Sequence, residues 1–276
     1  MFIHKEVITS RNNPTVKLVA SLADKKGRAA EKCFIAEGEK LTYEALSARL
    51  PVTKILIRED KAEAVTEKIK ALCSASEPDS LDIFILSGTA FEKISTEKAP
   101  QGVISVIKYL DFFSNIDIIY NEEIFSENER VLALYSLRDP SNLGSVIRSA
   151  VAFGVEHIIV SSDTADVYNP KTVRSAMGSL FKVKITSVSD FSAFICYAHK
   201  SKRQVLAAEL TDSAVPLSGI ELKRSDIIVI GNEGHGIARE ISELCDKSVY
   251  IPISEKTESL NASVAASLFM WEQSKL

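Results

Sequence analysis

Small and polar residues gather at three points where an apolar run gives way to a helix-like segment. The first stretch is Leu137–Ala150, the second is Gly231–Ile237, and the third is Ile251–Ile253 followed by Ser259–Ala265. Open α/β sheets bind their ligands at turns that lead from a strand into a helix. Three such turns can line one pocket, so the sequence predicts a binding or catalytic site there.

The stretch Gly231–Gly236 places three glycines in six positions. Glycine leaves backbone N–H groups accessible to an anion or to the edge of an adenine ring. The order G-x-x-G-x-G departs from the dinucleotide fingerprint, and no phosphate-binding G-x-x-x-x-G-K motif occurs. Glu233 would repel phosphate groups, so it is expected to face a cation, a guanidinium or a hydroxyl. A purely structural tight turn is the alternative.

The other two stretches carry hydrogen-bonding groups near the start of a predicted helix. Asn142 is expected at a helix cap, with Arg148 six residues later, within two turns. Ser259 is expected as the cap of the last helix and Asn261 in its first turn. Each feature alone is typical of ordinary helix ends and solvated faces. The sequence shows no Ser-His-Asp, Cys-His or paired-carboxylate arrangement that would indicate hydrolysis, and its scattered cysteines and histidines predict no metal site.

The 276 residues, of which 46% are hydrophobic, predict an α/β protein of two domains. We place an α/β domain at 1–112, an acidic linker at 113–129 and a second α/β domain with a mostly parallel sheet at 130–276. The sheet is inferred from nearly continuous apolar strands, which are typical of strands covered on both faces. The expected N-terminal elements are helices at 14–22, 40–48 and 62–72 and strands at 34–36, 52–57, 82–86 and 103–107. The expected C-terminal elements are strands at 131–135, 157–160, 183–186, 204–208, 226–230 and 248–251 and helices at 143–153, 171–179, 191–199, 237–244 and 260–272.

Charge is unevenly distributed along a chain whose net charge is −4. Between Lys5 and Lys32 there are seven basic residues and three acidic ones, an excess that suits the phosphates of a nucleic acid. A solvated helix face is the alternative reading. No apolar run is long enough to span a membrane and the N-terminus lacks a signal peptide, so a cytoplasmic location is expected. The candidate residues for binding these phosphates are Arg11, Lys25, Lys26 and Arg28, which become candidate RNA-binding residues under the resemblance described next.

Taken together, the three stretches resemble the SpoU (TrmH) family of RNA 2′-O-ribose methyltransferases, a part of the SPOUT superfamily. The resemblance covers about Val131–Trp271 and includes Tyr168–Lys171 and Arg174–Ser179 as a middle segment. Thr9–Pro14 and Phe34–Gly38 resemble the substrate-binding domain that many members carry, which has the fold of a small ribosomal protein. Ser254–Glu258 departs from the family, because many members have a glycine and fewer charges there.

The resemblance implies a trefoil-knotted catalytic domain, S-adenosylmethionine as cofactor, no metal, and an active site at a homodimer interface. It implies that backbone groups hold the cofactor at Gly231, Ile251 and Leu260. It implies catalytic and RNA-positioning roles for Asn142, Arg148, Glu233, Ser259 and Asn261.

The resemblance implies methyl transfer from S-adenosylmethionine to a ribose 2′-hydroxyl, with ribosomal RNA as the expected substrate. Arginine stays protonated in proteins, so Arg148 is expected to bind a phosphate beside the hydroxyl instead of acting as a base. Glu233 would orient Arg148 or the hydroxyl, while Ser259 and Asn261 would hold the loop and the ribose. The alternatives are the same chemistry on transfer RNA, a catalytically silent RNA-binding or assembly protein of this fold, and an enzyme acting on a small nucleotide.

Overall fold

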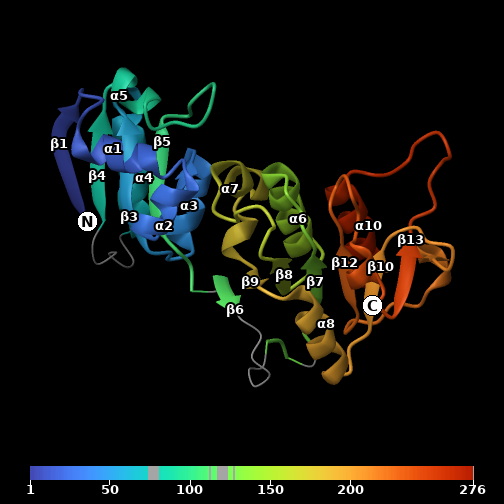
Figure 1. Ribbon diagram of the computed structural model, residues 1–276. Helices are drawn as coiled ribbons and strands as arrows, with labels where there is room; N and C mark the ends of the chain where they lie inside the picture. Colours follow the sequence, from blue (N-terminus) through green and yellow to red (C-terminus); the bar gives the residue numbers. More distant parts are fainter. Residues whose placement is uncertain (74–80, 112, 117–123, 127, 276) are drawn as a thin grey trace. The chain divides into compact units, whose positions relative to one another are not determined.

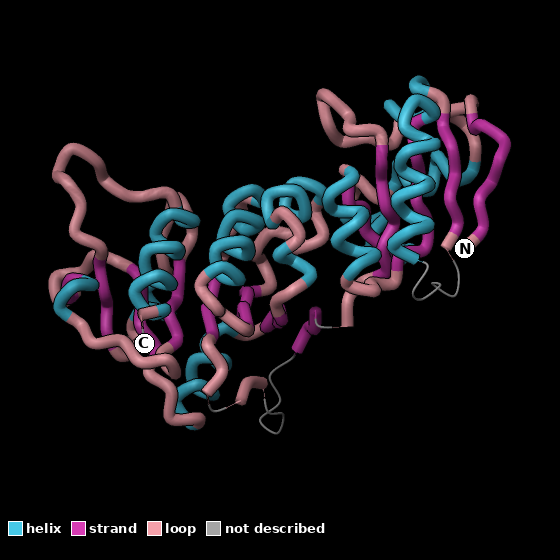
Figure 2. The backbone as a smooth tube through the Cα atoms, turned by 180° about the vertical axis from the view of Figure 1, so that it is seen from behind, coloured by secondary structure: helices cyan, strands magenta, loops and turns pink. Residues whose placement is uncertain are grey.

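The structure, a computed structural model, describes residues 1–73, 81–111, 113–116, 124–126 and 128–275. The chain forms two compact units, each with its own sheet (Figure 1). The first unit comprises Met1–Leu110 and Asp166–Phe181, and the second comprises Asp111–Ala165 and Lys182–Leu276. Helices alternate with strands in both units (Figure 2).

The first unit contains a mixed five-stranded sheet with the order β1-β4-β3-β5-β2. β1 and β3 pair in parallel with β4, whereas β5 pairs antiparallel with β3 and β2. The strands are β1 (Phe2–Ile8), β2 (Cys33–Glu37), β3 (Val52–Arg58), β4 (Asp82–Leu86) and β5 (Val103–Lys108). The helices are α1 (Pro14–Ser21), α2 (Lys25–Glu31), α3 (Glu39–Ser47), α4 (Ala62–Cys73), α5 (Gly88–Glu92) and α7 (Pro170–Ala176), with short 3₁₀ turns η1 (Glu59–Lys61) and η2 (Ser179–Phe181).

The segment Asp166–Phe181 belongs to the first unit, although it lies within the stretch predicted as the second domain. The ring of Tyr168 stacks between Phe34 and Tyr109, with ring centroids 4.6 and 4.3 Å apart. Its hydroxyl accepts a hydrogen bond from the backbone N–H of Leu110 at 2.9 Å. These contacts anchor the start of α7 on the end of β5, which explains the grouping.

The second unit contains an eight-stranded sheet with the order β11-β13-β10-β12-β7-β8-β9-β6. Every strand pair recorded in it is parallel, so the prediction of a mostly parallel sheet is confirmed. The strands are β6 (Phe113–Ile116), β7 (Val131–Leu134), β8 (His157–Ser161), β9 (Lys184–Val188), β10 (Val205–Ala208), β11 (Val215–Pro216), β12 (Ile227–Ile230) and β13 (Lys247–Tyr250). The helices are α6 (Pro140–Ala152), α8 (Phe191–Lys200), α9 (Arg239–Ser242) and α10 (Ala262–Ser274), with the 3₁₀ turn η3 (Leu217–Gly219).

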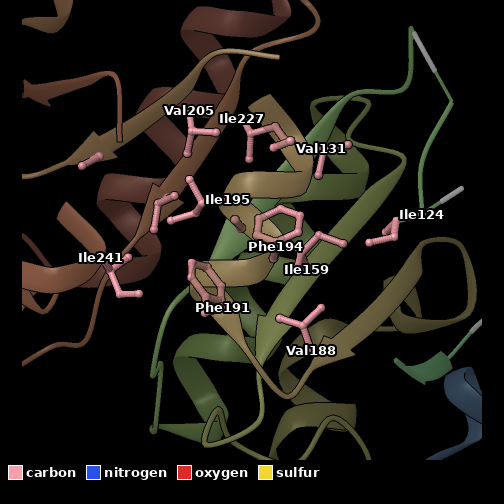
Figure 3. Close-up of a cluster of buried hydrophobic side chains, with 14 of the residues drawn as sticks. Ile124, Val131, Ile159, Val188, Phe191, Phe194, Ile195, Val205, Ile227 and Ile241 are labelled. Carbon is pink, nitrogen blue, oxygen red and sulfur yellow. The ribbon is translucent and has the colours of Figure 1, made fainter. Parts of the chain in front are cut away.

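A hydrophobic cluster fills one face of this sheet (Figure 3). Phe191, Phe194 and Ile195 of α8 pack against alternate residues of the strands, among them Val131 and Ile227. Successive strand residues point to opposite faces. The intervening residues therefore face the other side, where α10 packs against α6 and β12. Because β10 lies between β12 and β13, the chain must cross back over β10 after β13 for α10 to pack against β12. The expected knot stays a prediction.

The stretch 113–129, predicted as an acidic linker, is partly structured. Its first four residues form β6, which pairs in parallel with β9 at the edge of the sheet. Ile124 and Phe125 are buried in the cluster of the second unit, and the guanidinium of Arg203 lies 4.4 Å above the Phe125 ring. Residues 117–123 and 127, which carry part of the predicted acidic run, lie outside the described residues.

His157 of β8 makes the stability of the second unit sensitive to acid. Its side chain is fully buried, and its Nε2 lies 2.8 Å from the Thr186 hydroxyl. Burial, helped by Lys184 and Arg203, lowers the pKa of His157 to about 3, even though a Glu129 oxygen lies 3.5 Å from Nδ1. In the unfolded chain the pKa of histidine is about 6.5, so between pH 6.5 and 3 the unfolded state binds a proton that the folded state does not.

We therefore expect this group to lower the free energy of unfolding as the pH falls below about 6.5, by up to about 1.4 kcal/mol per pH unit. Urea unfolding of the protein and of His157→Gln, compared between pH 7 and 4.5, measures the effect. Glutamine keeps a polar group near Thr186 but does not titrate, so the variant should lose stability less steeply. Equal slopes for the two proteins would contradict the buried neutral histidine.

Candidate active site

The three stretches singled out in the sequence follow β7, β12 and β13. All three strands are parallel, so their carboxyl ends lie at the same edge of the sheet. β7 and β12 are direct neighbours, and only β10 separates β12 from β13. The sheet topology therefore brings the first segment together with the other two, which follow it 91 and 119 residues later as counted from Asn142 to Glu233 and to Asn261.

Hydrogen bonds join the three segments into one polar chain. Asn142 donates from its Nδ2 to Oε1 of Glu233 at 3.0 Å, and its Oδ1 accepts from Nδ2 of Asn261 at 3.0 Å. Asn261 in turn accepts at its Oδ1 from the backbone N–H and the hydroxyl of Ser263, at 2.9 and 2.6 Å. An ionised carboxylate only accepts and a backbone N–H only donates. These two ends therefore fix the orientation of both amide side chains between them.

Glu233 is exposed at the tip of the loop after β12, and its carboxylate faces N–H donors from the start of α6. Besides Asn142, it lies 3.4 Å from the backbone nitrogen of Arg138 and 3.3 Å from that of Asp139. Donors on one side hold the carboxylate and leave its remaining lone pairs for a ligand hydroxyl. Of the two roles predicted for Glu233, orienting Arg148 has no support within the described part of this single copy, because Glu233 makes no hydrogen bond or ion pair with Arg148 there.

The helix caps differ from the prediction. Asp139 is the N-cap of α6 and accepts from the backbone N–H of Asn142 at 2.8 Å, so the expectation that Asn142 is the cap is wrong. Asn261, not Ser259, caps α10. The Asp139 carboxylate accepts from an N–H group in the first turn of α6, as an N-cap residue does. The side-chain amide of Asn142 is therefore available to bond to Glu233 and Asn261. Within the described part of the chain, the Ser259 hydroxyl takes no part in this network.

The loop after β12 depends on glycine and on Asn232. The backbone groups of Asn232 and Gly236 exchange hydrogen bonds at 2.9 and 3.0 Å, and Gly236 has a φ of +65°. A Cβ atom on Gly231 would lie 2.5 Å from the carbonyl carbon of Gly236. Glycine at 231 is therefore required by the loop itself. Asn232, which the sequence analysis did not single out, accepts at its Oδ1 from the N–H groups of Gly234 and His235 at 2.9 and 3.1 Å.

The residues expected to hold a cofactor lie at the same edge of the sheet. Gly231 follows β12 directly, Ile251 follows β13 directly, and Leu260 comes just before α10. Among the described residues, no recorded hydrogen bond uses the backbone N–H of these three residues. Free backbone donors beside a glycine turn suit the edge of an adenine ring, so the segment fits the expected cofactor. The divergent residues Ser254–Glu258 form an exposed turn in the connection between β13 and α10.

Arg148 lies apart from the polar chain. It is exposed on α6, and no ion pair or hydrogen bond holds its guanidinium within the described ranges. Six residues of α-helix separate it from Asn142 by about 9 Å along the axis and about 120° around it. One copy of the chain therefore does not bring Arg148 to Glu233.

Three of the four candidate RNA-binding residues are exposed on the first unit, namely Arg11, Lys25 and Lys26. Arg28 is only 1% exposed, so its assignment as an RNA contact is wrong. Its guanidinium donates to the carbonyl oxygens of Leu22 and Ala23 at 2.9 and 2.7 Å and pairs with Asp166 at 2.6 Å. A buried arginine needs hydrogen-bond acceptors and a negative charge to replace the water it loses. A count of charges along the sequence does not show whether a given basic residue of α2 lies on the buried or the exposed face.

The described residues hold no cluster of histidine, cysteine and carboxylate side chains arranged for a metal ion. Nor does any described helix combine the length and apolar character that a membrane span needs.

Comparisons with known proteins identify the family. The SpoU rRNA Methylase family matches residues 129–271, and the MRM3-like substrate binding domain matches residues 13–105. The 23S rRNA (guanosine(2553)-2′-O)-methyltransferase RlmP of Bacillus subtilis is 29% identical over 264 residues, which cover 96% of this chain and 97% of that protein. A putative TrmH family tRNA/rRNA methyltransferase of Staphylococcus aureus is 30% identical over 240 residues, 85% of this chain and 93% of that protein.

A solved structure supports the same assignment. The AdoMet-bound rRNA methyltransferase of Sinorhizobium meliloti matches with a TM-score of 0.81 and 28% identity, covering 99% of this chain and 98% of that one. The likeness confirms the predicted fold class, an α/β methyltransferase of SPOUT type preceded by a smaller substrate-binding domain. The chain belongs to the SpoU rRNA methylase family.

Proposed function

We propose that the protein is an S-adenosylmethionine-dependent RNA methyltransferase that modifies a ribose 2′-hydroxyl of ribosomal RNA. The observation that carries this proposal is the hydrogen-bonded chain from Asn261 through Asn142 to Glu233, which unites all three sequence motifs at one edge of the sheet. A loop built only for stability has no need of a carboxylate, two side-chain amides and free backbone donors on three separate segments.

The cofactor supplies a methyl group on a positively charged sulfur, and the protein supplies the geometry. Backbone groups of Gly231, Ile251 and Leu260 bind it without using charged side chains. Glu233, held by Asn142, accepts a hydrogen bond from the ribose hydroxyl and turns the oxygen towards the methyl carbon. As that oxygen bonds to the methyl carbon, the carbon–sulfur bond would break, its electron pair would stay on the sulfur, and the demethylated cofactor would leave as a neutral thioether. The hydroxyl proton would pass to an RNA phosphate or to water.

Arg148 binds the phosphate beside the reacting ribose and stabilises the negative charge that develops on the oxygen. Because Arg148 lies away from Glu233 in one copy, we propose that the site is completed in a homodimer, with Arg148 of a second copy reaching the polar chain. α10 supports this arrangement. Val264 and Trp271, two turns apart on that helix, are 47% and 49% exposed, an apolar stripe that a second copy would cover.

Ribosomal RNA is the favoured substrate because the B. subtilis relative is named a 23S rRNA methyltransferase and matches almost the whole chain. Transfer RNA is the second candidate, since the S. aureus relative is named a tRNA/rRNA methyltransferase. We place the enzyme in the cytoplasm, where both RNAs are found.

Transfer of a labelled methyl group from S-adenosylmethionine to total RNA tests the proposal. RNA from a strain that lacks the gene should accept label, and fractionation should find it in ribosomal RNA as a 2′-O-methyl nucleoside. Label in transfer RNA would select the second candidate. Absence of label in any RNA would favour the catalytically silent protein.

The exposed lysines of α2 should contribute to RNA binding by pairing with phosphates. Replacing Lys25 and Lys26 by alanine is expected to weaken RNA binding at low salt and to lower the slope of log affinity against log salt by about 0.7 to 0.9 for each phosphate that is no longer neutralised. Filter binding between 50 and 300 mM salt measures both quantities. The exposed pair Lys68 and Lys70 on α4 provides the matched control. An unchanged slope in the Lys25/Lys26 variant would place the RNA surface elsewhere.

A further inference from the structure

A second polar cluster lies beside the candidate active site, where β7 and β8 end. Asp163, two residues beyond β8, accepts from the hydroxyls of Ser136 and Ser161 at 2.5 and 2.7 Å and from Nη2 of Arg138 at 3.2 Å. Burial raises the pKa of this carboxyl, but the hydrogen bonds from Ser136, Ser161 and Arg138 outweigh it and lower the pKa below its ordinary value. Asp163 is therefore an ionised acceptor with three donors at neutral pH.

Ser136 occupies an unusual backbone conformation. Its φ is +55°, a left-handed value that residues other than glycine seldom adopt. Its N–H donates to the Ser161 hydroxyl at 2.8 Å, and its own hydroxyl donates to Asp163. Asp163 and Ser161 together hold the turn that leads from β7 to Arg138 and Asp139.

That turn contacts the loop that carries Glu233. The carbonyl oxygen of Ser136 accepts from Nδ2 of Asn232 at 2.7 Å, and Oδ1 of Asn232 shapes the loop by accepting from Gly234 and His235. The same turn presents the N–H of Arg138 to the Glu233 carboxylate. Asp163 thus acts on both sides of Glu233, through Asn232 on one side and through Arg138 on the other.

We propose that Asp163 is a positioning residue for methyl transfer, which acts through Ser136 and Asn232 to set Glu233 against Asn142. This inference rests on the proposed function and deepens it. Asp163 is not expected to touch RNA or cofactor, so its effect is on the rate of the chemical step and not on binding.

The test compares Asp163→Ala, Asp163→Asn and the exposed control Asp212→Asn in the full-length protein. Removing an outer hydrogen-bonding partner of a metal ligand costs about 10- to 100-fold in affinity or activity, and we expect a loss of similar size for Asp163. Asp163→Ala should lower kcat by that amount, with the RNA KM and the S-adenosylmethionine Kd within about 3-fold of wild type. Asp163→Asn, which keeps one acceptor oxygen for Ser136, should retain more activity than alanine. Asp212→Asn should behave as wild type.

A double variant shows whether Asp163 acts through Glu233. If it does, Asp163→Ala should cause little further loss when Glu233→Gln is already present, because the effects of coupled residues do not add. Fully additive losses, or a wild-type kcat in Asp163→Ala, would overturn the inference while leaving the proposed function intact. A loss of thermal stability and of cofactor binding in both Asp163 variants would overturn it in favour of a purely structural role. If the wild-type protein methylates no RNA, the proposed function and this inference fail together.

Discussion

Arg148→Ala is expected to lower the rate of methyl transfer by about 100- to 1000-fold, the usual cost of losing a group that stabilises charge in a transition state. Affinity for S-adenosylmethionine should stay within a few-fold of wild type, because Arg148 lies on α6 and the cofactor is proposed to bind backbone groups of Gly231, Ile251 and Leu260. Arg148→Lys should also be poor, since an ammonium cannot make the planar bidentate contact to phosphate. Single-turnover rates and calorimetry of cofactor binding measure the two effects.

Arg239 provides the matched control for this prediction. It is an exposed arginine of α9 in the same unit, with a side chain that is 89% exposed. Arg239→Ala should retain nearly full activity. Wild-type turnover in Arg148→Ala would remove Arg148 from the mechanism.

Glu233→Gln is expected to lower the single-turnover rate at saturating RNA by about 100-fold. The change replaces one acceptor oxygen by an NH₂ group. That group would face the amide of Asn142 or the N–H groups of Arg138 and Asp139, so a donor would meet donors. The order of donors and acceptors in the hydrogen bonds from Glu233 through Asn142 to Asn261 would then be lost. Glu240→Gln, an exposed substitution on α9, should leave the rate unchanged. The prediction fails if Glu233→Gln turns over like wild type.

The two variants together test the proposed composite site. In a heterodimer of one Arg148→Ala chain and one Glu233→Gln chain, a site built from both copies carries either both changes or neither. Such a heterodimer, purified with two different tags, should regain about half of the wild-type activity. If each site is built from one copy, both sites carry one change and activity stays near zero.

Much of the fold follows from patterns that are local in the sequence. The strands of the second unit are continuous apolar runs because both faces are buried, so β7, β8 and β12 could be predicted within about two residues of their observed ends. β1 was missed because Phe2–Ile8 mixes charged and apolar residues without a regular alternation. α2 was missed because it is short, polar and contains a glycine.

The site shows where reading a sequence alone reaches its limit. The three motifs could be predicted to converge, because parallel strands end at one edge. The sequence could not show that Asn142 bridges Glu233 and Asn261. Asp139 and Asn142 are both suitable N-cap residues for α6, and only the packing decides which of them takes that position. Arg28 shows the same limit, because its charge suggested an RNA contact until its buried pairing with Asp166 was visible. Asp163 and Ser136 lie outside the motifs, and their spacing carries no pattern that marks them.

The most direct test of the proposed activity is methylation of an RNA that lacks the acceptor oxygen. Once the modified nucleotide has been mapped, two substrate RNAs are compared that differ only in a 2′-hydroxyl or a 2′-hydrogen at that nucleotide. Methyl transfer to the ribose predicts full incorporation of label into the first RNA and none into the second. Equal incorporation into both would show that the enzyme methylates a base, and would contradict the account of Glu233 as the residue that orients a ribose hydroxyl.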